Sequence, residues 1–292
     1  MAIIHSLAGL PQFPGRIVSL VPSISESLFD LGMGERLAGI TDYCVFPTEE
    51  TEKLPKVGGT RDLSINAIVD LEPDLVIANQ EENDRQQIEI LAGQMNVWLT
   101  FPRSVYDLLE DLRQLVYLYR EDTAFQRLRS LEMAVEYQEH FVSSVTARRV
   151  FVPIWMGEIE KDSQWWMTFN NETYCGDLIR LLGGENVFSQ RVRRYPLAAD
   201  LGLAEEEPAG ERDQRYPCVN GGEIRQAKPE VILLPTEPYR FSDQHIALVM
   251  EQFSDTPAVM QNKVFLVDGS LLTWHGTRLA KALDELGNLL TG

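Results

Sequence analysis

The sequence predicts an α/β protein of two Rossmann-like lobes, each with a parallel sheet, joined by one long α-helix. Helical and short apolar segments alternate in both halves of the chain, which is the order that produces parallel sheets. The segment Glu223–Leu234 repeats the order helix, proline, acidic residue, strand that surrounds Pro73. Between the halves, leucines recur at helical spacing, and there is no proline or glycine from Ser104 to Thr146.

The first half begins with the apolar run Ile17–Val21, which is closed by Pro22. Ser23 and Glu26 have the spacing of a capping box and predict a helix that ends at Gly32. A helix over 65–71 stops at Pro73, and a strand over 74–78 follows. The next elements expected are a helix over 84–93, a strand over 97–100 and a helix from Ser104, because continuous apolar runs are typical of buried parallel strands.

The second half follows the same pattern. A basic residue again precedes a strand, at 149–154, and the unit of helix, proline, acid and strand covers 223–234. A closing strand is expected at 264–267 and a final helix at 276–290. The matching order of the two halves indicates duplication.

These boundaries define three parts: an N-terminal lobe over 1–120, a linking helix over 121–147 and a C-terminal lobe over 148–292. A flexible linker would be rich in glycine, serine or proline, so the middle part is interpreted as a stiff hinge. The stretch of about 189–215 is predicted to be a polar, solvated insertion on the second lobe, since it carries clusters of arginine and glutamate.

Composition and charge narrow the range of functions that the protein can have. The 292 residues carry 44 acidic against 26 basic side chains, a net charge of −18, which argues against nucleic-acid binding and docking on anionic membranes. No apolar run approaches the roughly 20 residues needed to span a bilayer. The start of the chain lacks the pattern of a secretory signal, so a cytoplasmic location is expected, with a periplasmic or extracytoplasmic one as the alternative if a signal was removed.

The three cysteines (Cys44, Cys175 and Cys218) are far apart and odd in number, which predicts reduced thiols and no disulfide framework. Motifs of dinucleotide binding, phosphate loops, zinc proteases and serine hydrolases are absent from the sequence. The residues alone therefore predict a two-lobed binding protein without an intrinsic cofactor, with its ligand outside the carboxyl ends of the strands.

Several segments together resemble the cobalamin and iron-chelate substrate-binding proteins of ABC importers. They are 16–26, 39–43, 55–59, 71–78, 183–188, 216–219 and 267–269. The similarity is collinear from about 16 to 290. It implies two lobes on a helical backbone, a ligand between lobes that move little on binding, and no catalysis.

Within this family the chain looks most similar to the cobalamin-binding type. Tyr43 matches a position whose aromatic ring packs on the corrinoid, whereas Thr60 and Asn79 stand where that type has tryptophan. The expected ligand is therefore a metal-bearing organic molecule, with cobalamin or another corrinoid first and haem or a ferric siderophore next.

Candidate ligand contacts follow the predicted strands. In the first lobe they are Tyr43, Asn79, Glu81, Glu82 and Asn83; in the second they are Trp155, Trp166, Tyr239, Trp274, His275 and Arg278. Broad aromatic faces suit a planar macrocycle, and Arg278 matches a family arginine that holds a ligand group or braces the lobe. His275 or Tyr43 is a candidate axial metal ligand, although a core position is the alternative for the tryptophans and for His275.

Partner contacts are expected to differ from those of importer-bound family members, which carry one surface glutamate on each lobe for the membrane subunits. Aligned on Pro73 and Pro229, those positions are Asn66 and Gly222, and Glu223 stands next to the second. The alternatives to a receptor are an intracellular tetrapyrrole- or metal-handling enzyme or chaperone that uses Glu81, Glu82 and His275, and a small-effector signalling module.

Overall fold

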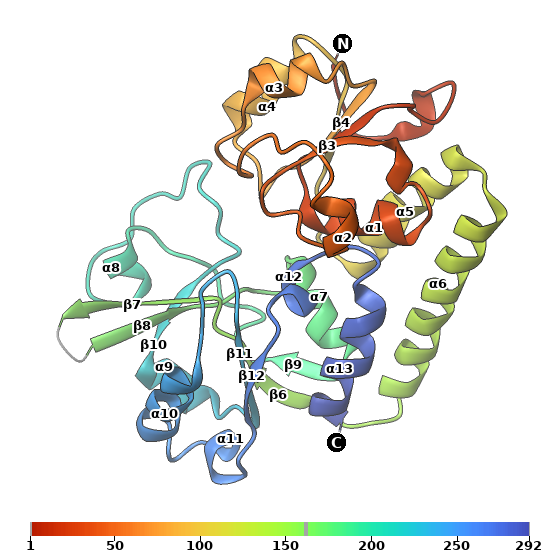
Figure 1. Ribbon diagram of the computed structural model, residues 1–292. Coiled ribbons are helices and arrows are strands. Elements are labelled where there is room, and N and C mark those ends of the chain that lie inside the picture. Colours follow the sequence, from red (N-terminus) through yellow and green to blue (C-terminus); the bar gives the residue numbers. More distant parts are fainter. Residues whose placement is uncertain (1, 161–162, 292) are drawn as a thin grey trace. The chain divides into compact units, whose positions relative to one another are not determined.

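The computed structural model describes residues 2–160 and 163–291. The chain forms two compact units (Figure 1). The first comprises Met1–Pro102, Tyr106–Ala134 and Trp274–Ala280, and the second comprises Arg103–Val105, Val135–Thr273 and Lys281–Gly292. The chain thus passes between the units several times.

The first unit contains a five-stranded parallel sheet in the order β1-β5-β4-β2-β3. Its strands are β1 (Ile3–Ile4), β2 (Ile17–Ser19), β3 (Leu37–Ile40), β4 (Leu75–Asn79) and β5 (Val97–Thr100). The helices of this part are α1 (Pro22–Asp30), α2 (Thr48–Thr51), α3 (Ile65–Asp70), α4 (Arg85–Ala92) and α5 (Val105–Tyr119). Every residue of β2 and β4 is buried, as their continuous apolar runs predict.

The second unit contains a parallel sheet in the order β12-β11-β6-β9 and an antiparallel sheet in the order β10-β8-β7. The parallel strands are β6 (Arg148–Phe151), β9 (Gly184–Asn186), β11 (Val231–Pro235) and β12 (Val264–Val267). The antiparallel strands are β7 (Trp155–Glu160), β8 (Ser163–Met167) and β10 (Cys218–Asn220). The helices are α7 (Tyr174–Leu181), α8 (Leu197–Asp200), α9 (Gly221–Ala227), α10 (Asp243–Gln252), α11 (Pro257–Met260), α12 (Ser270–Thr273) and α13 (Leu279–Thr291).

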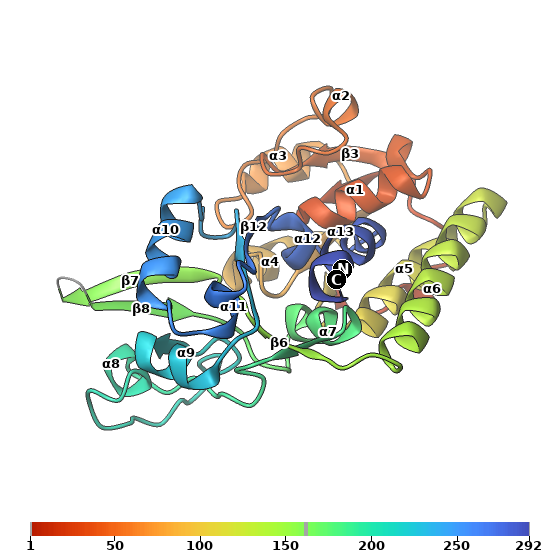
Figure 2. The ribbon, with the colours of Figure 1, turned by 90° about the horizontal axis from the view of Figure 1, so that it is seen from below.

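The stretch interpreted as one long helix contains two. Helix α5 ends at Tyr119, Arg120 adopts a positive φ of 63°, and α6 (Asp122–Val142) begins two residues later. The left-handed residue breaks the helix without proline or glycine, which is why the composition did not reveal it. Helix α6 is continuous (Figures 1 and 2) and passes from the first unit to the second after Ala134.

The duplicated sequence pattern corresponds to a duplicated arginine anchor. In the first unit, the backbone N–H of Arg16 donates to Asp74 Oδ2 (2.9 Å), and its Nη2 donates to the Leu71 carbonyl (2.7 Å). In the second unit, the N–H of Arg149 donates to Glu230 Oε2 (2.8 Å), and its Nη2 donates to the Ala227 carbonyl (2.6 Å). Each anchor ties one strand to the acidic turn before its neighbouring strand.

The predicted capping box of α1 is wrong. The helix begins with Pro22 in its first turn, and no side chain caps it. Proline is favoured at this position because its fixed φ suits the helix and it lacks an N–H to satisfy. The carboxylate of Glu26 is instead bound to Arg278.

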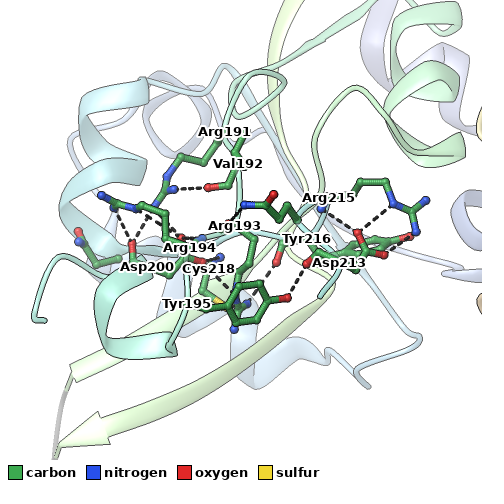
Figure 3. Close-up of polar contacts among 12 residues, drawn as sticks. Arg191, Val192, Arg193, Arg194, Tyr195, Asp200, Asp213, Arg215, Tyr216 and Cys218 are labelled. Atoms are coloured by element: carbon green, nitrogen blue, oxygen red, sulfur yellow. Dashed lines mark hydrogen bonds and ion pairs between the residues drawn. The ribbon is translucent and has the colours of Figure 1, made fainter. Parts of the chain in front are cut away.

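The insertion is a solvated loop only in its second half, where residues 202–208 and 210–213 are exposed. Asp200 is fully buried at the end of α8, and arginines 191, 193 and 194 converge on it (Figure 3). A buried carboxylate needs such partners. The arginines therefore form an internal ion-pair network, and not a surface patch.

Of the helices in 2–160 and 163–291, none combines the length and apolar character that a bilayer crossing requires. Cys44, Cys175 and Cys218 are free thiols, as their number and spacing predict.

Candidate ligand-binding surfaces

The carboxyl ends of β2 and β4 form a topological switch point in the first sheet. From β2 the chain continues to β3 on one side and then to β4 on the other. In open α/β sheets, ligands bind outside the strand ends at such a point. The segments that lie here are the start of α1 and the loop 80–83 after β4.

Two asparagines build the loop after β4. The side-chain carbonyl of Asn79 accepts from the backbone N–H groups of Glu81 (2.8 Å) and Glu82 (3.3 Å). Asn83 accepts from the N–H of Asn79 (2.8 Å) and donates to the carbonyls of Leu20 (3.2 Å) and Thr60 (3.0 Å). Both side chains are buried. They hold the loop in place, and their contact with a ligand stays a prediction.

The two glutamates of this loop are half-buried. Arg61 donates to the Glu81 carbonyl (2.7 Å), and Glu82 Oε1 lies 3.5 Å from His275 Nε2. The loop thus places two carboxylates at the switch point, where a cationic or metal-bearing group could meet them.

His275 is buried at the same switch point. Its Nδ1 lies 3.4 Å from Ser23 Oγ, and its Nε2 lies 3.3 Å from the amide nitrogen of Asn79. Burial lowers the pKa of His275 to about 4 and outweighs the opposing effect of a backbone hydrogen bond, so the imidazole is neutral at pH 7. Both ring nitrogens face protein groups, which favours the structural role that the sequence left open for His275; the axial-ligand role stays a prediction.

This environment predicts a pH-dependent contribution to stability. Between pH 6.5 and about 4 the unfolded chain binds a proton at His275 that the folded protein does not, so stability falls as the pH decreases. The contribution is at most about 3 kcal/mol. We expect His275→Gln to flatten this part of the curve of unfolding free energy against pH, measured by urea denaturation at pH 4 to 8.

The difference between the stability curves of the wild type and His275→Gln reports the titration of His275 alone. Other groups, such as Asp111, whose pKa is raised to about 7 by burial and by the carboxylates of Asp107 and Glu110, titrate equally in both. Parallel curves for the wild type and His275→Gln over this range would contradict the assignment.

The segment 274–280 packs on α1, although the sequence places it in the second lobe. The backbone N–H of Thr277 donates to Ser27 Oγ (3.0 Å), and the Thr277 hydroxyl donates to Asp30 Oδ2 (2.5 Å). A Cβ on Gly276 would lie 2.4 Å from Ser27 Oγ and 2.8 Å from the Ser23 carbonyl oxygen. Glycine at 276 therefore permits this close approach.

Arg278 on this segment is buried against α1 and is bound in a fork by Glu26, with Nε–Oε2 and Nη2–Oε1 distances of 2.8 and 2.6 Å. Its guanidinium carbon lies 4.5 Å from the ring centre of Phe46 and 4.8 Å from that of Trp274. Of the two roles that the sequence left open for Arg278, these contacts favour the brace.

Three aromatic side chains in these loops form what we call the first aromatic surface: Tyr43, Phe46 and Trp274. Tyr43 and Phe46 follow β3 and are 62% and 40% exposed, while Trp274 is half-buried and packs edge-on against Phe46. Tyr43 lies three residues before Phe46 in the same loop, and the exposed apolar side chains of this loop make it a candidate binding surface.

In the second unit, Trp155 and Tyr239 form the second aromatic surface. Trp155 is 45% exposed, and its ring centre lies 5.3 Å from that of Tyr239, in the loop after β11. Trp166, in contrast, is fully buried, stacks on Phe241 and contacts Phe253. It lies in the core, which favours the alternative that the sequence left open for this tryptophan.

The sequence-based reasoning missed Phe46 and Glu26 as parts of the site. Phe46 lies three residues after Tyr43 in the loop that follows a predicted strand, and this position was the available signal. The sequence pattern assigned Glu26 to a helix cap. Its partner, Arg278, lies 252 positions away, and no local pattern marks so distant an ion pair.

Among the residues that the structure describes, no three histidine, cysteine or acidic side chains are grouped as metal ligands. Tyr43 stays a predicted axial ligand.

The positions aligned with the importer contacts of the family are also visible. Asn66 and Gly222 are both exposed. Neighbouring Glu223 is not a free substitute: its Oε2 accepts from the N–H of Asn220 (3.0 Å) in a capping box, and its Oε1 lies 3.4 Å from Arg191 Nε.

Two α/β units with aromatic surfaces at the carboxyl ends of their strands define a protein of the solute-binding class. The family model described as periplasmic binding protein matches residues 17–271. The chain therefore belongs to this family of binding proteins, and not to an enzyme family.

Individual relatives agree with this assignment. The chain is 28% identical to a vitamin B12-binding protein of Pectobacterium atrosepticum over 67% of this chain and 74% of that protein. Its fold is similar to the periplasmic vitamin B12 binding protein BtuF of Vibrio cholerae, with a TM-score of 0.74 and 18% identity over 96% and 97% of the two chains. It is also similar to the periplasmic heme-binding protein RhuT of Roseiflexus, with a TM-score of 0.69 and 24% identity over 94% and 97%. The predicted fold class is thereby confirmed.

Proposed function

We propose that this protein binds a metal-bearing organic ligand, with cobalamin or another corrinoid first and haem or a ferric siderophore chelate next. The observation that carries the proposal is the first aromatic surface, which is partly exposed at the carboxyl ends of a parallel sheet and braced from behind by Arg278. A flat apolar ring system with polar edges is the kind of ligand that stacks on such a surface. The relatives named for vitamin B12 and heme support the same ligand class.

A titration with three ligands tests the proposal. Purified protein is mixed with cyanocobalamin, hemin and a ferric siderophore chelate, and visible absorbance and tryptophan fluorescence are followed. We expect saturable 1:1 binding of at least one ligand at micromolar concentration or below, with the ligand recovered unchanged. Conversion of the ligand would instead favour an enzyme, and no binding of any ligand would refute the proposal.

Each exposed aromatic residue should contribute separately to ligand affinity. We expect Tyr43→Ala and Trp155→Ala each to weaken binding by about tenfold, since stacking on an aromatic side chain contributes roughly 1–3 kcal/mol. Ile90→Ala is a matched control, because Ile90 is also a large exposed apolar residue but lies on α4, outside both aromatic surfaces. If Tyr43→Ala and Trp155→Ala bind the ligand as tightly as the wild type does, these two residues do not contact it.

We further propose that the protein does not engage importer subunits through glutamates at the two family positions. Asn66 and Gly222 carry no charge, and the Glu223 carboxylate is bound within its own unit. Tight binding to purified importer membrane subunits that is lost on changing Glu223 would refute this. The cytoplasmic location stays a prediction, which cell fractionation tests.

A further inference from the structure

Glu26 and Arg278 form a bidentate ion pair in which both side chains are largely removed from solvent. The exposed fractions are 15% for Glu26 and 6% for Arg278. Each oxygen of the carboxylate faces a different nitrogen of the guanidinium, so the pair fixes orientation as well as distance. A buried arginine without this partner would be an uncompensated charge.

The guanidinium of Arg278 contacts two of the three rings of the first aromatic surface. Phe46 and Trp274 are within 4.5 and 4.8 Å of its carbon, and their own ring centres are 5.9 Å apart at 62°. Three distant stretches of chain, α1, the loop after β3 and the segment 274–280, therefore meet at one cation.

The carboxylate of Glu26 is turned toward Arg278 and is the charge that balances it. Loss of that charge would break the fork that orients the guanidinium and would weaken its hold on the position between the two rings. The rings would then lose part of the contact that fixes their angle.

We infer that Glu26 is a positioning residue for ligand binding, which acts through Arg278 to hold Phe46 and Trp274 in the arrangement that receives a planar macrocycle. The inference rests on the proposed function. Rigid presentation of the rings increases affinity because fewer side-chain conformations have to be ordered when the ligand binds.

The variant Glu26→Gln tests this, because it keeps the shape of the side chain and removes its charge. We expect about tenfold weaker binding of cyanocobalamin or hemin, whichever the wild type binds, and a changed near-ultraviolet circular dichroism signal of the aromatic side chains. Glu89→Gln is the matched control, since Glu89 pairs with Arg85 on the surface of α4 in the same unit. It should change neither quantity.

A double-variant cycle separates positioning from general destabilisation. The effect of Glu26→Gln on affinity should become smaller in a Phe46→Leu background, because one of the two rings it positions is gone, and should persist in full in a Trp155→Ala background. Additive effects with Phe46→Leu, or unchanged affinity of folded Glu26→Gln, would overturn the inference.

Two further measurements keep the test decisive. If Glu26→Gln does not fold, Arg278→Lys retains the charge but loses the fork, and it should show the same loss of affinity. If the wild type binds neither ligand, the proposed function fails, and the dichroism comparison still reports whether Glu26 orders the rings. An unchanged spectrum of the variant would then refute the positioning role itself.

Discussion

Asp200→Ala is expected to destabilise the second unit by about 3–5 kcal/mol, because it removes the buried carboxylate that Arg193 faces and one of the two carboxylates that Arg191 faces. Arg191 Nη2 lies 3.0 Å from Oδ1 of Asp200, and Arg193 Nε lies 3.2 Å from Oδ2. The backbone N–H groups of Arg194 (3.0 Å) and Cys218 (2.6 Å) donate to the same carboxylate. The variant removes all of these interactions at once (Figure 3).

Urea denaturation followed by tryptophan fluorescence measures this loss. Asp213→Ala is the control: its carboxylate binds Arg215 in the same insertion but is 43% exposed, so a change below about 1 kcal/mol is expected. A similar free energy of unfolding for Asp200→Ala and the wild type would show that the arginines find other partners or solvent.

Gly276→Ala should have the second large effect, on both stability and ligand binding. The added methyl group would lie 2.4 Å from Ser27 Oγ and 2.8 Å from the Ser23 carbonyl oxygen, so the segment 274–280 has to move away from α1. We expect a loss of about 1–3 kcal/mol in stability. Ligand affinity should fall more than tenfold, because Trp274 and Arg278 move with the segment.

Two variants test the cause of this effect. Gly9→Ala is the matched control, since a methyl group there meets no atom within 4 Å. Ser27→Gly combined with Gly276→Ala should restore part of the stability, because the hydroxyl contact is relieved while the backbone contact with Ser23 persists. Wild-type affinity and stability for Gly276→Ala alone would contradict the packing described here.

The pattern of the sequence predicted the longer apolar strands of both parallel sheets and the helices next to them, but not the strands β1, β3 and β9. Strands such as β4 and β11 are uninterrupted apolar runs preceded by proline and an acidic residue, and local composition is enough to recognise them. The antiparallel sheet of β7, β8 and β10 was not predicted, because it joins a local hairpin to a strand some 50 residues further along the chain.

The candidate site was predicted least well where its residues depend on distant contacts. Strand ends pointed to Tyr43, in the loop after β3, and to Trp155, at the start of β7, and both side chains are exposed. They could not show that His275 and Arg278 face α1, since no local signal marks a contact across 252 residues. The roles of Asn79 and Asn83 could not be predicted for a different reason. An asparagine that hydrogen-bonds within its own loop cannot be distinguished, in the sequence, from one that faces a ligand.

The central claim is that the aromatic surfaces bind a metal-bearing organic ligand. Calorimetric titration of the wild type and of the double variant Tyr43→Ala/Trp155→Ala with cyanocobalamin and with hemin tests it most directly. The account predicts one saturable site in the wild type, for at least one of the two ligands, and an affinity about a hundredfold lower in the double variant. Equal affinity in both proteins, or no binding to the wild type, would contradict it.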